Sequence, residues 1–205
     1  RANGKGINHK QSMRTLKKLD IGYGYTADGG QTVPFRGQGV GLMPTFDEII
    51  QEFPDKKFLI DQKDRFEKTI DLLANYLRKY SEEQRQNIYL FSEEKNYQLL
   101  KKQVPQVQKI FPTRKETKDC IPEYLTMLFS GEVSKSCNKY AFGVPTGYLK
   151  YIPGWSSNLF LTKAREAKLK VYVTEVDTKE DWEGIKDLPL DGIVTNRIEL
   201  IGLLR

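Results

Sequence analysis

The chain has one histidine, two cysteines and no long apolar run, and each scarcity excludes a kind of site. The single histidine, His9, cannot complete a zinc site, and the cysteines lack the close spacing of metal ligands. Without about 18 consecutive apolar residues, no membrane span is expected. A signal peptide and an initiator Met are also missing, and residues 1–6 look like the middle of a loop. The chain is therefore expected to be a piece of a longer protein.

The charge of the chain is mildly positive, with 33 basic and 27 acidic residues and a net charge of +6. The basic residues are scattered in isolated pairs such as Lys17-Lys18 and Lys101-Lys102. A nucleic-acid groove would need a denser basic stripe with interleaved aromatic residues. We therefore expect no nucleic-acid partner.

The two cysteines, Cys120 and Cys137, flank a loop-like stretch at residues 130–136. A disulfide that closes this loop and a pair of thiols both fit the sequence. A disulfide would imply an oxidising, extracytoplasmic compartment, either periplasmic or secreted. The location of the protein depends on this pair alone.

The first 45 residues are rich in glycine and have little periodicity, which predicts a long loop with a short helix near residues 13–19. Residues 37–41 invite comparison with a dinucleotide-binding loop, but no strand precedes them and no long helix follows directly, which excludes that interpretation. Thr45 and Glu48 then form a capping box, which predicts a helix that begins at Phe46.

Beyond this helix, short apolar runs alternate with amphipathic segments. Strands are predicted at residues 58–62, 88–92, 107–111, 141–144, 170–176 and 191–195. Helices are predicted at residues 66–77, 97–102, 122–129, 158–167 and 198–204. A further helix is predicted to begin after a cap formed by Thr178 and Asp181. This alternation predicts an α/β fold with parallel strands, and a doubly wound sheet and a barrel both fit it.

Two details favour a TIM (β/α)8-type barrel. The last strand, at residues 191–195, is followed at once by a short helix, as in the final unit of a closed barrel. Polar residues also lie at the C-terminal ends of several strands, as in barrel enzymes. These residues are Asp61, Lys63, Ser92, Thr174, Glu175 and Thr195. A barrel needs eight strands, so residues 1–205 are expected to form one N-terminally truncated domain with about six of the eight units.

The first strand ends in an acid and a base, Asp61 and Lys63. Side chains alternate along a strand, so these two share a face about 7 Å apart along the backbone. Together they could hold a divalent cation and a phosphate side by side. The alternative is a solvated charge pair at the end of a strand.

The order of several motifs resembles that of the glycerophosphodiester phosphodiesterase family. These motifs are Asn3-Gly4-Lys5-Gly6, Leu16-Lys17-Lys18-Leu19-Asp20-Ile21-Gly22, Met43-Pro44-Thr45-Phe46-Asp47-Glu48-Ile49-Ile50, Phe58-Leu59-Ile60-Asp61-Gln62-Lys63, Val171-Tyr172-Val173-Thr174-Glu175-Val176-Asp177 and Asp191-Gly192-Ile193-Val194-Thr195-Asn196. The match runs in order over nearly the whole chain.

The resemblance implies a TIM barrel, one divalent cation, Mg²⁺ or Ca²⁺, and hydrolysis of a glycerophosphodiester to glycerol 3-phosphate and an alcohol. Asp61 matches the metal-binding acid of the family's Glu-x-Lys motif, and Lys63 matches its phosphate-binding, catalytic lysine. Glu175 is a further candidate for substrate binding. A carboxylate suits a hard cation, and an ammonium group would neutralise charge that grows on the phosphate oxygens.

The chain also departs from the family pattern. The His-Arg-Gly, Glu-x-Asp and His-Asp motifs, which carry both catalytic histidines, are absent, and His9 is expected to be a loop residue. Thr174 stands where the family has tryptophan. The chain alone is therefore expected to be inactive, with a preceding segment of the same protein as its partner. Two alternatives are a lipase-D-like relative that acts on lysophospholipids, which would need an apolar groove, and a non-catalytic relative that binds phosphate ligands.

Overall fold

The computed structural model describes residues 2–7, 10–63 and 67–203. His9 and Phe66 therefore lie outside the described residues. The chain divides into two compact units, Arg1–Lys56 and Lys57–Arg205.

The first unit contains two short helices, α1 (Met13–Leu16) and α2 (Phe46–Glu52). The capping box predicted for α2 is confirmed, because the Thr45 side chain accepts from the backbone of Glu48 and the Glu48 side chain accepts from the backbone of Thr45. Between these helices, the predicted loop is organised by Asp20, which is 3% exposed.

The Asp20 carboxylate accepts three backbone hydrogen bonds from glycines on both branches of the loop. Its Oδ1 atom accepts from the N–H groups of Gly22 and Gly39, both at 3.0 Å, and its Oδ2 accepts from Gly37 at 2.7 Å. A side chain at Gly39 would meet the backbone of Gly22 at 2.4 Å, so only glycine permits this approach. The buried carboxylate thereby pairs amides that would otherwise lack partners.

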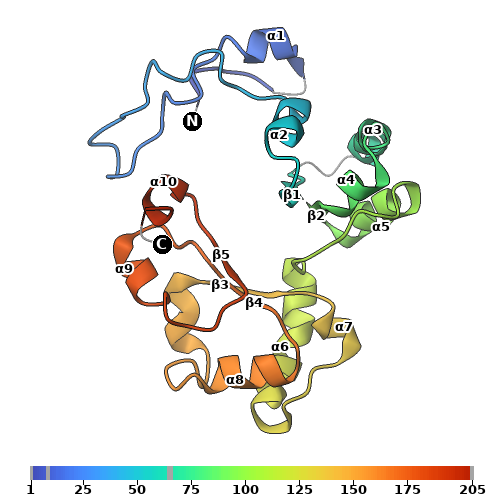
Figure 1. The fold of residues 1–205 in the computed structure, drawn as a ribbon, viewed down its shortest axis with the longest axis vertical. Helices are drawn as coiled ribbons and strands as arrows, with labels where there is room; N and C mark the ends of the chain where they lie inside the picture. The colour runs from blue at the N-terminus through green and yellow to red at the C-terminus, as the bar shows by residue number, and fades with distance from the viewer. Residues whose placement is uncertain (1, 8–9, 64–66, 204–205) are drawn as a thin grey trace. The chain divides into compact units, whose positions relative to one another are not determined.

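The second unit carries all five strands found in the described residues, and every strand pair is parallel. The strands are β1 (Phe58–Asp61), β2 (Ile88–Phe91), β3 (Phe142–Pro145), β4 (Val171–Thr174) and β5 (Gly192–Val194). They form a two-stranded sheet, β1-β2, and a three-stranded sheet, β3-β4-β5, whose strands lie side by side in Figure 1. The predicted pattern of parallel strands connected by helices is therefore confirmed.

The strand predicted at residues 107–111 is wrong, because this segment makes only one isolated parallel bridge, between Gln108 and Tyr89. The segment lies between Pro105 and Pro112, and proline cannot donate a backbone hydrogen bond to a strand ladder. The segment still connects the two sheets. Gln108 exchanges backbone hydrogen bonds with β2, and the carbonyl of Ile110 accepts from the N–H of Ala141 at 2.8 Å, directly before β3.

The strands follow one another in space in the order of the sequence. β1 pairs with β2, β2 bonds to the segment at Gln108, and β3, β4 and β5 follow. A doubly wound sheet reverses its strand order at a switch point, whereas a barrel wall does not. The described strands form no closed ring, and β1 and β5 are the outer strands.

Helices follow the strands, as the alternation predicts. They are α3 (Glu67–Leu77), α4 (Glu82–Gln86), α5 (Glu94–Gln103), α6 (Arg114–Ser130), α7 (Lys135–Asn138), the 3₁₀ helix η2 (Thr146–Tyr151), α8 (Leu159–Glu166), α9 (Lys179–Glu183) and α10 (Ile198–Ile201). The helix predicted to begin at Pro122 begins at Arg114 instead. A capping box of Thr113 and Glu116 starts it, and Gly131 ends it with a left-handed φ of 69°.

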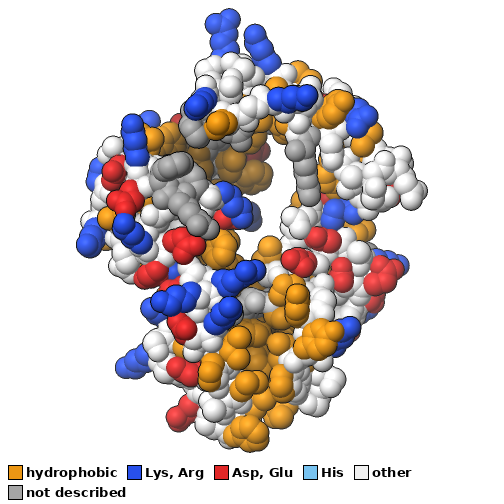
Figure 2. All heavy atoms as spheres, turned by 180° about the vertical axis from the view of Figure 1, so that it is seen from behind, with side chains coloured by type: hydrophobic (Ala, Val, Ile, Leu, Met, Phe, Trp, Pro, Cys, Tyr) orange, Lys and Arg blue, Asp and Glu red, His pale blue; other side chains and the backbone are white. Residues whose placement is uncertain are grey.

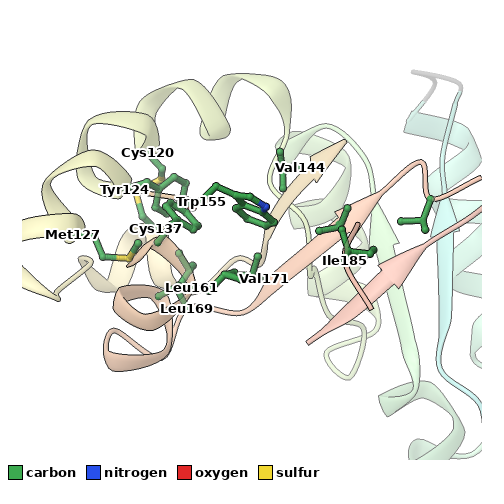
Figure 3. Close-up of a cluster of buried hydrophobic side chains, with 14 of the residues drawn as sticks. Cys120, Tyr124, Met127, Cys137, Val144, Trp155, Leu161, Leu169, Val171 and Ile185 are labelled. Atoms are coloured by element: carbon green, nitrogen blue, oxygen red, sulfur yellow. A yellow bond between two sulfur atoms is a disulfide. The ribbon is translucent and has the colours of Figure 1, made fainter. Parts of the chain in front are cut away.

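The core of the second unit lies where α6 and α8 pack with β3 and β4 (Figure 3). Val171 and Val173 of β4 are buried in this core, while the alternate residues Tyr172 and Thr174 are only partly buried. Trp155 is 8% exposed and packs in the same core cluster.

The two cysteines are joined by a disulfide between Cys120 of α6 and Cys137 of α7, with Cα atoms 5.6 Å apart. Both cysteines are 4% exposed and belong to the same core cluster. The bond holds the short helix α7 against the middle of α6. Of the two alternatives that the sequence left open, a disulfide or a pair of thiols, the structure contains the disulfide.

Candidate functional site

A cavity of about 320 Å³ lies at the C-terminal ends of the strands of the second unit. The register pairs Asp61 with Phe91, and pairs Thr174 with both Pro145 and Val194. All five of these strand ends line the cavity. Parallel strands bring their C-terminal ends to one edge, which is where α/β enzymes place their active sites.

Asp61 is the only charged side chain among the described residues that line this cavity. The other walls are mainly apolar and aromatic, and include Phe91, Phe111 and Phe142. Tyr124 adds a further ring, and its pKa is raised to about 12, first by burial and then by the carboxylate of Glu123. This tyrosine is therefore neutral at ordinary pH, and the charge in the cavity comes from the end of β1.

Lys63 lies next to Asp61, with its Nζ atom 2.5 Å from Oδ2 of the carboxylate. The sequence predicts a strand that continues to residue 62, whereas β1 ends at Asp61 and Lys63 lies two residues beyond it. The Lys63 side chain is 81% exposed and the Asp61 side chain 43% exposed. Ion pairs this open to water are weak, so the ammonium group can exchange its partner at little cost.

Glu175 directly follows β4 and has a left-handed backbone, with φ of 61°. This conformation costs a residue other than glycine about 1–2 kcal/mol. The Glu175 carbonyl accepts a hydrogen bond from Thr146 Oγ1 at 3.3 Å, which connects the ends of β3 and β4. The side chain is exposed and is not among the described residues that line the cavity. Its predicted role in substrate binding stays a prediction.

Ser92 and Thr195, the other polar residues at predicted strand ends, make local hydrogen bonds. Ser92 Oγ donates to the carbonyl of Glu93, and Thr195 Oγ1 donates to Asp177 Oδ1 at 3.1 Å. Burial opposes ionisation of Asp177, but hydrogen bonds from Asn196 and then Thr195 outweigh it and lower the pKa of this carboxyl. Asp177 therefore anchors the turn after β5 as a charged acceptor.

The described part of the chain contains no group of three or more His, Cys, Asp or Glu residues placed to hold a metal ion. Mg²⁺ and Ca²⁺ take six or more oxygen ligands, several of which can be waters. In the cavity only Asp61 offers a carboxylate, beside the hydroxyls of Thr117, Tyr124 and Thr174. These described residues alone do not form a cation site.

The aromatic walls are the part of the site that the sequence did not predict. Tyr124 and Phe142 come from α6 and β3, and their rings meet edge to face with centroids 5.1 Å apart. The signal that could place Thr117 and Tyr124 on one helix face is the capping box of Thr113 and Glu116, eight to eleven residues before Tyr124. With the helix start placed at Pro122, this face could not be recognised.

The cavity at the C-terminal edge of consecutive parallel strands lies where α/β enzymes bind their ligands. The family model of the glycerophosphoryl diester phosphodiesterase family matches residues 8–200, and the chain belongs to this family. The family has the TIM-barrel fold and implies hydrolysis of phosphodiesters. The search of curated proteins found no match to this chain. None of the helices in the described ranges is long and apolar enough to cross a bilayer.

Proposed function

We propose that the protein hydrolyses glycerophosphodiesters to glycerol 3-phosphate and an alcohol in a metal-dependent reaction, with the catalytic histidines supplied from outside this chain. The observation that carries the proposal is the Asp61–Lys63 pair at the C-terminal edge of the parallel strands, with Asp61 lining the cavity. Family membership supports the reaction class.

The reaction adds water across one P–O bond. The water oxygen bonds to phosphorus, the bond from phosphorus to the alcohol oxygen breaks, and the alcohol leaves with a proton. Negative charge grows on the non-bridging oxygens in the transition state. The Lys63 ammonium, held by only an exposed ion pair, would move onto one of these oxygens and stabilise that charge.

Asp61 would provide one oxygen ligand to a divalent cation, Mg²⁺ or Ca²⁺, and the remaining ligands would come from residues outside the described part of the chain. A bound cation would neutralise phosphate charge and orient the ester. The role proposed for Asp61 is therefore to bind and position, and the proton transfers belong to groups elsewhere.

We further propose that a preceding segment of the same protein completes a (β/α)8 barrel. Two features support this. The outer strands β1 and β5 each have one edge that pairs with no other described strand. Leu59 and Val194, on those strands, are 45% and 42% exposed although they line the cavity. In a closed barrel such inward side chains are covered by neighbouring strands. The chain alone would then be inactive.

The test is turnover of glycerophosphocholine by the intact protein, measured as released glycerol 3-phosphate. Lys63→Ala should lower turnover at least about 100-fold if the ammonium stabilises the transition state. Lys186→Ala is the matched control. Lys186 also forms an ion pair with a carboxylate, that of Glu183, but it is not one of the described residues that line the cavity. A loss below about threefold for Lys63→Ala would refute the catalytic role. No hydrolysis by the intact protein would favour a non-catalytic, phosphate-binding relative.

We also propose an oxidising, extracytoplasmic location. The buried bond between Cys120 and Cys137 supports it, because structural disulfides persist in such compartments. Alkylation of the protein taken directly from its cells, followed by mass measurement, tests this proposal. Two alkylated cysteines would contradict it.

A further inference from the structure

A second cavity, of about 500 Å³, lies towards the N-terminal edge of the strands of the second unit, whereas Asp61 lies at their C-terminal edge. Its lining includes Lys57, Lys109, Lys139, Lys168 and Lys170, and no carboxylate of the described residues lines it. Lys109 already pairs with Glu94 and Glu116. The other four lysines are exposed and take part in no ion pair within the described part of the chain. We call this space the basic cavity.

The single sign of its charge distinguishes the basic cavity from much of the surface. On the face shown in Figure 2, Lys and Arg side chains lie among Asp and Glu side chains. Exposed lysines elsewhere in the second unit pair with nearby acids, as Lys163 does with Glu166. A hollow lined by charge of one sign focuses the electrostatic potential and attracts counter-ions. The basic cavity is therefore suited to an anion.

Separate segments of the chain bring these lysines to one edge. Lys57 directly precedes β1, Lys170 directly precedes β4, and Lys139 lies three residues before β3. The Asn138 side chain donates from Nδ2 to the carbonyl of Ala167 at 2.8 Å. This bond joins the residues directly before Lys139 and Lys168, so it holds these two lysines on one side of the cavity.

One carboxylate lies near this group without lining the basic cavity. Asp191, directly before β5, lines a smaller neighbouring cavity together with Lys168 and Lys170. Its Oδ2 atom accepts a hydrogen bond from the backbone N–H of Val171 at 2.8 Å. Asp191 therefore secures the start of β4 and leaves the lysines with an excess of positive charge.

The backbone at Lys168 gives a second, independent sign of a binding role. Lys168 follows the C-terminal cap of α8 and has a left-handed backbone, with φ of 57°. The N–H groups of Lys168 and Leu169 donate to the carbonyls of Arg165 and Ala164, which forms the helix end at which glycine is the usual residue. A side chain in this conformation is disfavoured, and such strain is concentrated at functional sites. The strained position here carries an ammonium group to the cavity.

We propose that the basic cavity binds a small anion that carries two or more phosphate groups, held by Lys57, Lys139, Lys168 and Lys170. Four ammonium groups carry more charge than one phosphate group can neutralise, which favours a multivalent anion. The site is separate from Asp61 and Lys63, so the inference goes beyond the proposed hydrolysis. Further barrel strands would pair beside β1 and β5, whereas these lysines precede their strands and would stay at the open N-terminal edge.

The first experiment measures binding of inorganic phosphate, pyrophosphate and tripolyphosphate to the intact protein by calorimetry, without divalent cations. Affinity should rise at least about tenfold from phosphate to tripolyphosphate, because a contact between charged groups is worth about a factor of ten or more. Added salt should weaken the binding. Equal affinity for phosphate and tripolyphosphate, or no binding of either, would overturn the inference.

Two further arms of this experiment locate the site and identify the source of the phosphates. Lys63→Ala should bind tripolyphosphate as the wild type does, and a loss of binding would place the anion at Asp61 and overturn the inference. Adenosine triphosphate carries the same three phosphates on an organic group. Tighter binding of adenosine triphosphate would support an organic ligand, and tighter binding of tripolyphosphate an inorganic one.

The second experiment uses the double variant Lys168→Gln/Lys170→Gln, which should lower tripolyphosphate affinity at least about tenfold. Lys115→Gln/Lys118→Gln is the matched control, because it removes the same charge from exposed positions on α6 that do not line the cavity. An equal loss in the control would reveal a general attraction of anions to the protein and overturn the inference.

The single variant Lys168→Gly separates binding from folding. Glycine relieves the left-handed backbone, so the melting temperature should rise while tripolyphosphate affinity falls at least about threefold. A variant that is more stable and binds tripolyphosphate as tightly as the wild type would overturn the role of Lys168. These measurements do not require hydrolysis, so an inactive protein that binds tripolyphosphate would contradict the proposed function and support this inference.

Discussion

Replacing Lys109 with methionine should destabilise the protein, because the lysine is the buried centre of an ion network. The Lys109 side chain is only 2% exposed, and its Nζ atom lies 2.7 Å from Glu94 Oε2 and 2.8 Å from Glu116 Oε2. The ring centroids of Tyr140 and Tyr97 are 5.2 and 5.7 Å from the same ammonium group. A methionine side chain has nearly the length of the lysine side chain but lacks the ammonium group, so the positive charge and its hydrogen bonds to Glu94 and Glu116 are lost.

The expected loss in the free energy of unfolding is about 3 kcal/mol. Removing one partner of a buried ion pair costs about 3–5 kcal/mol, because the other charge is left without compensation. The Glu94 side chain is 43% exposed and regains water, so it adds little. The Glu116 side chain is 19% exposed and loses its counter-ion, which places the expected loss at the lower end of that range.

The same network predicts how stability changes with pH. Burial opposes ionisation of Glu116, but hydrogen bonds from Lys109, then Tyr140 and Thr113, outweigh it and lower the pKa from 4.5 to about 2. A lowered pKa stabilises the folded state above the unfolded value, so this contribution is full above pH 4.5 and is lost as pH falls towards 2. Lys109→Met should reduce this acid dependence.

Urea unfolding followed by tryptophan fluorescence measures both effects, since both tryptophans, Trp155 and Trp182, lie in the second unit. Lys186→Met, at an exposed ion pair, serves as the control and should not change stability measurably. A loss below about 1 kcal/mol for Lys109→Met would refute the reasoning. Adding Glu116→Gln should recover part of the loss, because it removes the uncompensated charge.

Three further predictions concern single features. Asp61→Ala should raise the Mg²⁺ or Ca²⁺ concentration needed for half-maximal activity, and an unchanged requirement would remove Asp61 from the proposed coordination shell. Cys120→Ala/Cys137→Ala should lower the free energy of unfolding by about 3 kcal/mol, because the unfolded chain regains the conformational entropy of a 17-residue loop. Thermal unfolding with and without reductant measures this loss. A variant as stable as the oxidised protein would contradict the prediction. Glu175→Gly should raise stability by about 0.5–1 kcal/mol, because glycine relieves the left-handed backbone, whereas Glu180→Gly inside α9 should lower it in the same urea assay.

Local sequence signals predicted the elements that depend on neighbouring residues. The capping boxes at Thr45 and Thr178 are both present, because each needs only a residue three positions later. Asp61 and Lys63 form an ion pair although β1 ends at Asp61, because only two residues separate them along the chain. In these cases the physical cause lies within a few residues of the chain.

Features that depend on distant residues were not predicted. Residues 107–111 have the composition of a strand, yet the prolines around them and the contacts of Lys109 with α5 and α6 limit them to one bridge. The wall of the cavity needs Tyr124 of α6 beside Phe142 of β3, residues that no local pattern relates. Closure of the barrel and the roles of Asp61, Lys63 and Glu175 stay predictions.

The Asp20 carboxylate holds both branches of the loop at their base, through Gly22 on one side and Gly37 and Gly39 on the other. The next contacts along the loop, between Tyr25 and Phe35 and from Arg36 to the carbonyl of Tyr23, also join one branch to the other. Loss of this single carboxylate would therefore leave three glycine amides without their partner and release both branches of the loop together.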